Sequence, residues 1–504
     1  MIEGLITFPS GQTKWPRKLE NLLRQQGLQG NSYRLAVGDI KDLITVTKAE
    51  QPRSIKLSDD LPPHILPYFH QTRSKYGENS FIWFGPTPRL IITDPQLMKE
   101  ILTKPEIFHK PLPDPIGETV AGGLLFLEDE KWANHRKIIN PAFHMEKLKN
   151  MVSAIRLSCS NMIDKWEDLI SSSSDEESGE IDVWSYLGDL SGDMISRTAF
   201  GSSHEEGRRI FELQREQVKL VLELIQFTFI PGWRYVPTKA NKRMKAISKE
   251  IQSLLRGIIN QREKAMERGE TIGDDLLSTL MESNLKEIEE HGNKNVGMSI
   301  EDVIEECKLF YFAGSETTSI LLVWTMVMLS KHQEWQVRAR EEVLQVFGKN
   351  EPTFDGLNRL KIVTMIIHEV LRLYTPAPII ARAPIKTVKL GNITTLPVGV
   401  GLVLLIGLLH HDPEIWGEDV NEFKPERFSE GISKATKNQF SYIPFSAGPR
   451  ICIGQQFAMI EAKMALAMIL QRFSFELSSS YLHAPFPILT LRPQYGATLL
   501  LRKH

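Results

Sequence analysis

The sequence predicts a mainly α-helical fold with a minor β portion. Apolar residues recur at helical spacing through most of the chain between residues 95 and 375, and short β-branched runs lie before and after this part. Of the 504 residues, 42% are hydrophobic and 24% are charged, which is typical of a globular protein with a packed core. By size alone, this length fits one large domain or two ordinary ones.

The N-terminal part predicts two helices followed by a β-hairpin. A basic amphipathic helix is expected at residues 16–27 and a second helix at 64–77, because both stretches carry apolar residues at helical spacing. Residues 80–94 contain two β-rich runs joined by a proline-containing turn, which predicts the hairpin. Residues 171–180 are expected to form a polar loop that buries nothing, and residues 229–239 an aromatic and proline-rich linker.

The longest helix is expected within residues 298–332. Ser299 is a good N-cap, and acidic residues follow it in the first turn. After residue 375, short β-branched and proline-punctuated runs predict strands, which are followed by a long loop. A helix at 454–473 and a final β-rich tail complete the chain.

Charge, cysteines and apolar stretches exclude several classes of protein. The net charge of −2 gives no bulk electrostatic reason to expect a nucleic-acid partner. Cys159, Cys307 and Cys452 lack the paired spacing of a disulfide framework or a zinc site, and this indicates a reducing compartment. The apolar stretches 320–329 and 396–409 are short of the ~20 residues that a membrane span needs, and the N-terminus does not resemble a secretory signal.

Cys452 stands just before the predicted helix that starts near Gly454. The free N–H groups of a first helical turn can stabilise a thiolate, and a thiolate can bind a metal. Gly448 and Gly454 permit a positive φ or the close approach of a flat macrocycle, and Arg450 offers a fork for a carboxylate. The simpler interpretation is that a lone cysteine among isoleucines is a buried small hydrophobe.

The surroundings of the cysteine favour the metal ligand. Phe445, Gly448, Arg450, Cys452 and Gly454 together match FxxGxRxCxG, and this loop resembles the cysteine-ligand loop of the cytochrome P-450 family, the haem-thiolate monooxygenases. The resemblance implies a haem-thiolate fold with a long central helix over the haem. It also implies haem b as the cofactor, with Cys452 as the axial ligand of the iron.

The resemblance runs from about residue 15 to the C-terminus, so residues 15–504 are expected to form a single haem-thiolate domain and residues 1–14 remain unassigned. Phrases such as DVIEECKLFYFAGSETTS are similar to the plant branch that includes secologanin synthase and related iridoid, triterpenoid and gibberellin oxidases. Two features differ from the family. Ser446 stands where glycine is common, and the transmembrane anchor with which plant relatives begin is not seen.

The sequence EVLR places Glu369 and Arg372 three residues apart, where they can pair on one helix face. Most such pairs are solvated surface pairs. Arg427, in FKPERF, resembles the third member of the family's buried Glu–Arg–Arg network. The resemblance implies that these three residues brace the loop that leads to Cys452.

The sequence AGSETT interrupts the apolar stretch of the longest helix. A local kink with a threonine bonded back to a carbonyl four residues earlier explains it without any function. The resemblance instead implies that Thr317 and Glu316 form the alcohol–acid pair that delivers protons to iron-bound dioxygen. It also implies that Ala313 and Gly314 leave room for dioxygen over the haem.

Trp132 and Arg136 are four residues apart in WANHR, so they share one helix face. The simpler interpretation is again a surface pair. Similar family members use these residues against the haem propionates, and the resemblance implies the same task for Arg450 and, less strongly, for Arg382.

The resemblance implies a monooxygenase that inserts one oxygen atom from O2 into an apolar, terpenoid-derived substrate. No GxGxxG motif follows a strand in this chain, so it is not expected to bind NADPH itself. The resemblance implies that NADPH electrons come through NADPH-cytochrome P-450 reductase, and that the protein lies at the cytosolic face of the endoplasmic reticulum membrane. The reductase is expected to dock on Lys131, Lys137, Lys463 and Arg472. Alternatives are a reductase-independent isomerase or dehydratase and a non-catalytic haem or ligand carrier.

Substrate contacts are expected from apolar residues in several separate segments, although apolar residues more often belong to a core. The candidates are Phe108, Leu124, Leu125, Phe312, Ile379, Ile380, Phe486 and Ile488.

Overall fold

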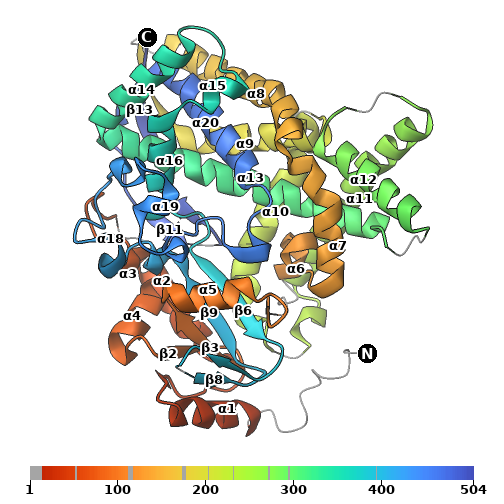
Figure 1. The fold of residues 1–504 in the computed structure, drawn as a ribbon, viewed down its shortest axis with the longest axis vertical. Coiled ribbons are helices and arrows are strands. Elements are labelled where there is room, and N and C mark those ends of the chain that lie inside the picture. The colour runs from red at the N-terminus through yellow and green to blue at the C-terminus, as the bar shows by residue number, and fades with distance from the viewer. Residues whose placement is uncertain are drawn as a thin grey trace.

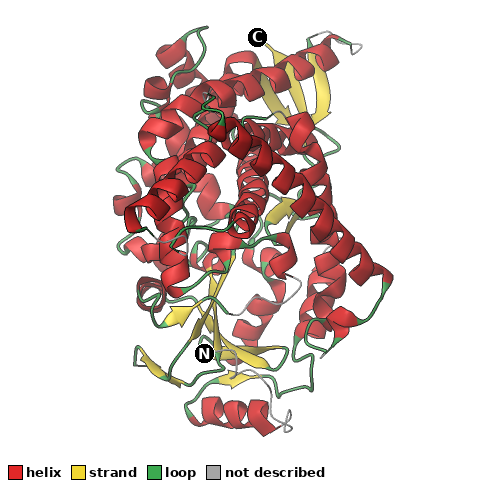
Figure 2. Cartoon of the chain, turned by 90° about the vertical axis from the view of Figure 1, so that its right-hand side faces the viewer, coloured by secondary structure: helices red, strands yellow, loops and turns green. Residues whose placement is uncertain are grey.

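The structure is a computed structural model, and it describes residues 14–50, 54–111, 117–172, 177–202, 204–230, 232–270, 273–292, 296–392, 394–487 and 489–504. The fold is mainly helical with a minor strand portion, as the sequence predicts. Helices fill most of the molecule, and the strands gather mostly at its two ends (Figure 2).

The longer helices enclose one large apolar core, and α13 crosses the middle of the molecule (Figure 1). They are α1 (Lys14–Gln25), α2 (Ile40–Glu50), α4 (Pro67–Tyr76), α5 (Pro95–Thr103), α7 (Asp129–Ile139), α8 (Met145–Ser171), α9 (Val183–Phe200), α10 (His204–Leu224), α11 (Lys239–Glu267), α12 (Leu276–His291), α13 (Ile300–Lys331), α14 (Gln333–Phe347), α16 (Lys361–Leu373) and α20 (Gln455–Arg472). Helices of a single turn include α3 (Pro62–Ile65), α6 (Gly117–Val120), α15 (Phe354–Leu357), α17 (Ile406–Leu409), α18 (Pro413–Trp416) and α19 (Ile432–Ala435).

A six-stranded sheet and a second apolar core lie at the end of the molecule near α1 (Figure 1). The strand order is β1-β2-β3-β9-β6-β4, in which β2 and β3 are antiparallel and β3 runs parallel to β9. These strands are β1 (Gln29–Gly30), β2 (Ser80–Phe84), β3 (Thr87–Ile92), β4 (Phe108–His109), β6 (Ile379–Pro384) and β9 (Gly401–Leu405).

Three smaller sheets complete the strand portion. Strands β10, β13 and β5 form one of them, β11 and β12 form a hairpin, and β7 pairs with β8. The strands are β5 (Ser178–Asp182), β7 (Val388–Leu390), β8 (Thr394–Leu396), β10 (Phe473–Leu477), β11 (Pro485–Pro487), β12 (Leu491–Pro493) and β13 (Thr498–Lys503).

Helix α13 organises the fold. Its N-terminus carries a capping box, because Ser299 and Asp302 each accept the other's backbone N–H, and this satisfies donors that the first turn leaves free. The helix packs against α9, α20 and α16. In the described ranges it is the one helix that is long and apolar enough to cross a bilayer, and most of that apolar stretch is buried inside the protein.

Two predicted elements differ from the structure. The helix expected at residues 64–77 is divided into α3 and α4, because Pro67 starts a new helix after Leu66 leaves the helical conformation. Within the loop expected at 171–180, Ser171 is the last residue of α8, residues 173–176 lie outside the described residues, and residues 178–180 belong to β5, which pairs with β13. Strand β5 lies at the edge of its sheet and buries only Ile181, so its sequence is polar enough to be taken for a loop.

Candidate active site

The loop that carries Cys452 is closed by three backbone hydrogen bonds. Ser446 N–H donates to Ile443 O at 3.0 Å, Ile451 N–H to Gly448 O at 3.0 Å, and Cys452 N–H to Phe445 O at 2.9 Å. Phe445 itself is half-buried against the main core. Two halves of the loop are therefore joined directly at the cysteine.

The two loop glycines differ in what requires them. Gly448 has φ +71°, and a Cβ there would lie 2.2 Å from the carbonyl oxygen of Leu102, so no other residue fits. Gly454 has φ −86°, which any residue adopts, and a Cβ there would meet only Phe143 at 3.8 Å. The expected positive φ is therefore wrong for Gly454, and close approach of a bound group remains its explanation.

Cys452 is exposed as a residue, yet protein atoms surround its thiol closely enough to affect its ionisation. Burial raises the pKa of the thiol, while the Gly454 amide and the Arg136 guanidinium lower it. The start of α20 thus lowers the pKa of the thiol, as predicted, but burial raises that pKa by more. A metal cation at the sulfur is the kind of group that deprotonates such a thiol.

The middle of α13 also has accessible surface. Ala313 is exposed and Thr317 half-buried, whereas the turns on both sides are largely buried. Thr317 Oγ1 donates to Ala313 O at 2.8 Å, which is the back-bonded threonine of the simpler interpretation. The hydroxyl oxygen still has lone pairs that can accept a hydrogen bond from a ligand.

Gly314 has a different task from the one expected. A Cβ at this position would lie 2.7 Å from Cδ1 of Ile195 on α9, and Ser191 Oγ of α9 donates to Gly314 O at 3.3 Å. The missing side chain therefore lets α13 approach α9 closely. The expectation that it leaves room for dioxygen is wrong, because the phase of the helix turns that position toward α9.

Glu316 is paired with residues that no motif indicated. Its Oε1 accepts hydrogen bonds from Thr490 Oγ1 at 2.7 Å and from Arg492 Nε at 2.5 Å. Arg492 lies on β12, and its ion pair with Glu316 is largely buried. Thr317 and Glu316 are neighbours in sequence whose side chains bond to different partners.

Two residues of α7 contact the Cys452 loop. Arg136 Nη1 donates to Ile451 O at 2.9 Å, and the ring of Trp132 lies 4.1 Å from the guanidinium carbon of Arg450. Arg450 also forms an ion pair with Glu128 and donates to Leu127 O at 2.7 Å. The structure thus brings Trp132, Arg136 and Arg450 together beside Cys452.

Lys110 and Arg382 lie close to Arg450, and with Arg136 they form what we call the cation cluster. Burial and the neighbouring Arg382 and Arg450 lower the pKa of Lys110 to about 7. Burial lowers the pKa of Arg382 to about 10. Among the described residues, Glu128 is the carboxylate in ion contact with the cluster, so the cluster holds more cations than anions. Sequence reasoning missed Lys110, because no motif surrounds it.

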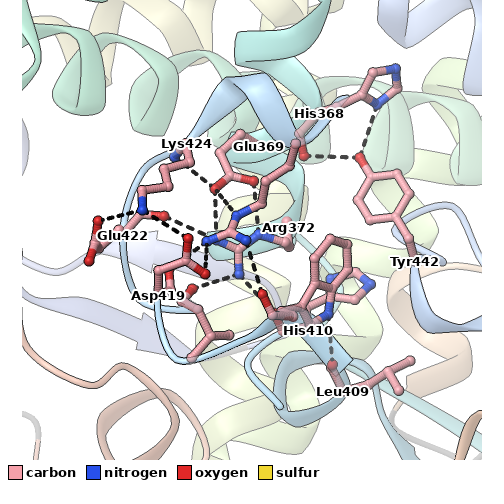
Figure 3. A network of polar contacts seen from close by, with 12 residues as sticks. His368, Glu369, Arg372, Leu409, His410, Asp419, Glu422, Lys424 and Tyr442 are labelled. Carbon is pink, nitrogen blue, oxygen red and sulfur yellow. Dashed lines mark hydrogen bonds and ion pairs between the residues drawn. The ribbon is translucent and has the colours of Figure 1, made fainter. Parts of the chain in front are cut away.

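Glu369 and Arg372 on α16 are fully buried beside the segment that leads to Cys452 (Figure 3). The Arg372 guanidinium donates to both Glu369 oxygens at 2.8 and 2.7 Å. It also donates to the carbonyl oxygens of His410 and Val420 at 3.0 and 2.7 Å. A buried pair is stable only when its other donors and acceptors are bonded too, and these contacts supply that.

Arg427 joins this pair. Its Nε lies 3.5 Å from Glu369 Oε1, and it bonds the carbonyl oxygens of Trp416 and Asp419 and the Asp419 carboxylate. Lys424 donates its backbone N–H to Glu369 and its ammonium to Asp419. The structure thus brings Glu369, Arg372 and Arg427 together. These three residues and Asp419, Glu422 and Lys424 form what we call the charge network.

The candidate substrate residues fall into two groups. Phe108 and Leu124 are buried in the cores, so the expectation of substrate contact is not met for these two side chains. The remaining described candidates keep accessible surface, and Ile488 lies outside the described residues; they are Leu125, Phe312, Ile379, Ile380 and Phe486.

Helix α13 fixes the loop that carries Leu124 and Leu125. Leu124 N–H donates to Glu306 Oε2 at 3.0 Å, and His135 Nδ1 lies 2.7 Å from Glu306 Oε1. Glu306 and His135 are both buried, and His135 belongs to α7. Sequence reasoning missed this pair, since the two residues are far apart in the chain.

The expected reductase-docking residues carry little free positive charge. Lys131 pairs with Asp302 and Lys137 with Glu287, each at 2.6 Å, while Arg472 pairs with Glu167 at 3.3 Å. Burial lowers the pKa of Lys463. Three of the four side chains thus have an acidic partner at the surface and the fourth is half-buried, and docking of a reductase on them stays a prediction.

The residues present fit a haem. Cys452 is exposed, the middle turn of α13 keeps accessible surface, and in the described part of the chain a Cβ at Gly454 would meet only Phe143, at 3.8 Å. Among the described residues the four basic side chains of the cation cluster have one carboxylate in ion contact, that of Glu128, which suits a group that brings two more.

These features define a haem-thiolate type of site, and the comparison with known families agrees. The chain matches the family model of cytochrome P-450 over residues 57–498, and it belongs to this family. The protein is accordingly an oxidoreductase of the monooxygenase type that carries out haem-dependent oxidation.

Several plant proteins are similar to the chain over almost its whole length. Cytochrome P-450 CYP72A219 of Panax ginseng is 57% identical over 96% of this chain and 93% of its own. Cytochrome P-450 72A397 of Kalopanax septemlobus is 57% identical over 97% of this chain and 93% of its own. Cytochrome P-450 72A15 of Arabidopsis thaliana is 54% identical over 97% and 94%.

Proposed function

We propose that residues 15–504 form one haem domain that inserts one oxygen atom of O2 into an apolar, terpenoid-type substrate. Electrons come from NADPH through NADPH-cytochrome P-450 reductase. The observation that carries the proposal is exposed Cys452 beside the cation cluster, in which Glu128 is the one described carboxylate in ion contact.

Each residue has a role in this proposal. Cys452 Sγ holds the iron, and Arg136, Arg450, Arg382, Trp132 and Lys110 hold the haem carboxylates. When bound, the haem supplies the iron that activates dioxygen, and thiolate ligation favours cleavage of the O–O bond.

Thr317 and Glu316 handle protons. Thr317 would hold a proton for delivery on the haem side of α13: its hydroxyl, which donates to Ala313 O as folded, would release that proton only as Oγ1 takes another from a donor that hydrogen-bonds to it. The Glu316 carboxylate is held by Arg492 and Thr490 as folded, so it takes part in proton transfer only after it leaves Arg492.

A threonine substitution tests the proton role. Thr317→Ala is expected to keep haem and to divert NADPH electrons into peroxide, measured as peroxide formed per NADPH consumed. Ser315→Ala is the matched control, because Ser315 Oγ makes the same kind of back-bond, to Tyr311 O at 2.9 Å. Full coupling in Thr317→Ala would show that this hydroxyl delivers no proton.

The substrate class is supported by three apolar candidate residues that keep accessible surface, Leu125, Phe312 and Ile379. Incubation with a terpenoid panel, reductase and NADPH, read by mass spectrometry, tests this class. Turnover of a substrate hydroperoxide, with none from NADPH, reductase and O2, would instead indicate the isomerase or dehydratase.

We place the protein at the cytosolic face of the endoplasmic reticulum membrane. Helix α1 is amphipathic and basic, and its Trp15 and Leu22 are exposed. A helix of this composition suits a membrane surface. Flotation of the chain with anionic vesicles, compared with a Trp15→Ser and Leu22→Ser variant, tests this placement.

A further inference from the structure

The chain segment before Cys452 is held by a buried imidazole outside the charge network. Ile443 N–H donates to Nε2 of His410 at 3.1 Å, and the His410 ring stacks on Tyr442 with the ring centres 5.4 Å apart. Figure 3 labels His410 and Tyr442 beside the charge network. His410 is completely buried.

His410 is itself fixed by the charge network. Its carbonyl oxygen accepts from Arg372 Nη1 at 3.0 Å, and its N–H donates to Ile406 O at 3.0 Å. Because Nε2 accepts a hydrogen bond, the ring is neutral and carries its proton on Nδ1. Burial agrees with this assignment, since it lowers the pKa of His410 well below its usual value.

Backbone bonds carry this anchor onward to the sulfur-bearing residue. Ile443 O accepts from Ser446 N–H, and Phe445 O accepts from Cys452 N–H. Ser446 has φ +62° without being glycine, so the turn between them is strained and needs a fixed start. A shift at Ile443 is therefore transmitted through this turn to Cys452.

We propose that His410 is a positioning residue, which sets the place of the Cys452 loop by accepting the Ile443 amide. This inference rests on the proposed function, because the result of correct placement is sulfur ligation of the haem iron. The Glu–Arg–Arg residues act on the loop through His410 as well as through their own contacts.

Two polar substitutions separate positioning from general stability. The side-chain oxygen of His410→Gln can lie near the place of Nε2 and accept the Ile443 amide, whereas His410→Asn is too short. His411→Asn is the matched control, because His411 is the buried neighbour whose ring bonds to Gly407 O at 2.8 Å and not to the loop.

The first measurement is hydrogen exchange of the Ile443 amide in the whole chain. His410→Asn is expected to speed it by about tenfold, the effect of losing one ordinary hydrogen bond. His410→Gln is expected to restore most of the protection, and His411→Asn to leave it unchanged.

The second measurement is the spectrum of the reduced, carbon-monoxide-bound haem. His410→Asn is expected to convert much of the thiolate band into the blue-shifted band of haem that has lost its thiolate, and His410→Gln to recover the thiolate band. Equal spectra and equal exchange in His410→Asn and His411→Asn would overturn the inference. A wild-type protein without any thiolate band would overturn the proposed function, and the exchange rates alone would then decide the anchoring.

Discussion

The charge network and the cation cluster are two groups of charged residues, and they differ in balance. In the charge network, Glu369, Asp419 and Glu422 pair with Arg372, Arg427 and Lys424. In the cation cluster, Glu128 is the carboxylate that pairs with Arg450, while Lys110, Arg136 and Arg382 add further cations. A balanced group stabilises the fold by itself, whereas an unbalanced one is suited to binding an anion from outside.

The directions of the pKa shifts express the same difference. Hydrogen bonds from Lys424 and Arg427 lower the pKa of Asp419 to about 2, so the charged form is favoured. Burial lowers the pKa values of Lys110 and Arg382, so their charged forms are disfavoured. The charges of the network are therefore paired within the protein, whereas those of the cation cluster are paired only in part.

Breaking the balanced network is expected to have the largest effect. Arg372→Met leaves the Glu369 carboxylate buried without its bidentate partner and should lower the free energy of unfolding by ~3–5 kcal/mol. Urea unfolding, or loss of soluble protein, measures this. Arg338→Met is the control, because its pair with Glu426 is exposed and long at 3.8 Å. Equal losses in the two variants would contradict a structural role for the network.

The unbalanced cluster predicts a dependence on pH. The pKa of Lys110 falls from 10.5 unfolded to about 7 folded, so the unfolded state binds more protons between these values. In protein without haem, the free energy of unfolding should therefore rise as the pH goes from about 7 to about 10.5, through this group. Lys110→Met should remove that rise and should stabilise the haem-free protein most below pH 7.

Denaturant unfolding of haem-free protein across this range checks the prediction, with exposed Lys41→Met as the control. A slope that is the same in Lys110→Met and in wild type would show that Lys110 is not held uncharged. In the haem-bound protein, Lys110→Met is expected to destabilise instead, because the haem carboxylates supply the missing anions and favour the charged lysine.

The sequence revealed the parts of the site that are local in the chain. Glu369 and Arg372 lie one helical turn apart, and the residues around Cys452 form one continuous loop, so their spacing is visible without the fold. The mainly helical architecture follows from periodicity in the same way. Arg492 reaches Glu316 from 176 residues away, and no local spacing marks that contact.

Other predictions from the sequence failed because it does not show in which direction a side chain points. Gly314 was assigned to the oxygen site, but its missing Cβ points at Ile195 because of how α13 is rotated against α9. Phe108 was expected to contact substrate, yet its ring is buried in the second core. The rotation of a helix and the depth of a side chain depend on packing between distant elements.

Glu461 of α20 is a buried acid that belongs to neither charge group, and it accepts a hydrogen bond from Thr318 Oγ1 at 2.9 Å. Burial raises its pKa from 4.5 to about 8, so the folded state binds more protons between these values and its stability falls as the pH rises through them. Glu461→Gln keeps the shape and removes the charge. We compare the urea midpoint of the variant with that of wild type at two pH values. The variant's gain over wild type should be larger at pH 8.5 than at pH 5. An equal gain at both pH values would show that Glu461 is already ionised in the folded protein at pH 5.

The smallest expected effect concerns the turn between the two charge groups. Ser446 lies at φ +62°, where a side chain costs ~1–2 kcal/mol, and its buried hydroxyl has no hydrogen-bond partner in the described part of the chain. Ser446→Gly should therefore raise the free energy of unfolding by up to ~1 kcal/mol, after the greater freedom of glycine in the unfolded chain is subtracted. Ser429→Gly, at φ −59°, is expected to destabilise slightly, and thermal unfolding compares the two. A lower melting temperature in Ser446→Gly would show that the turn holds its shape through the serine rather than in spite of it.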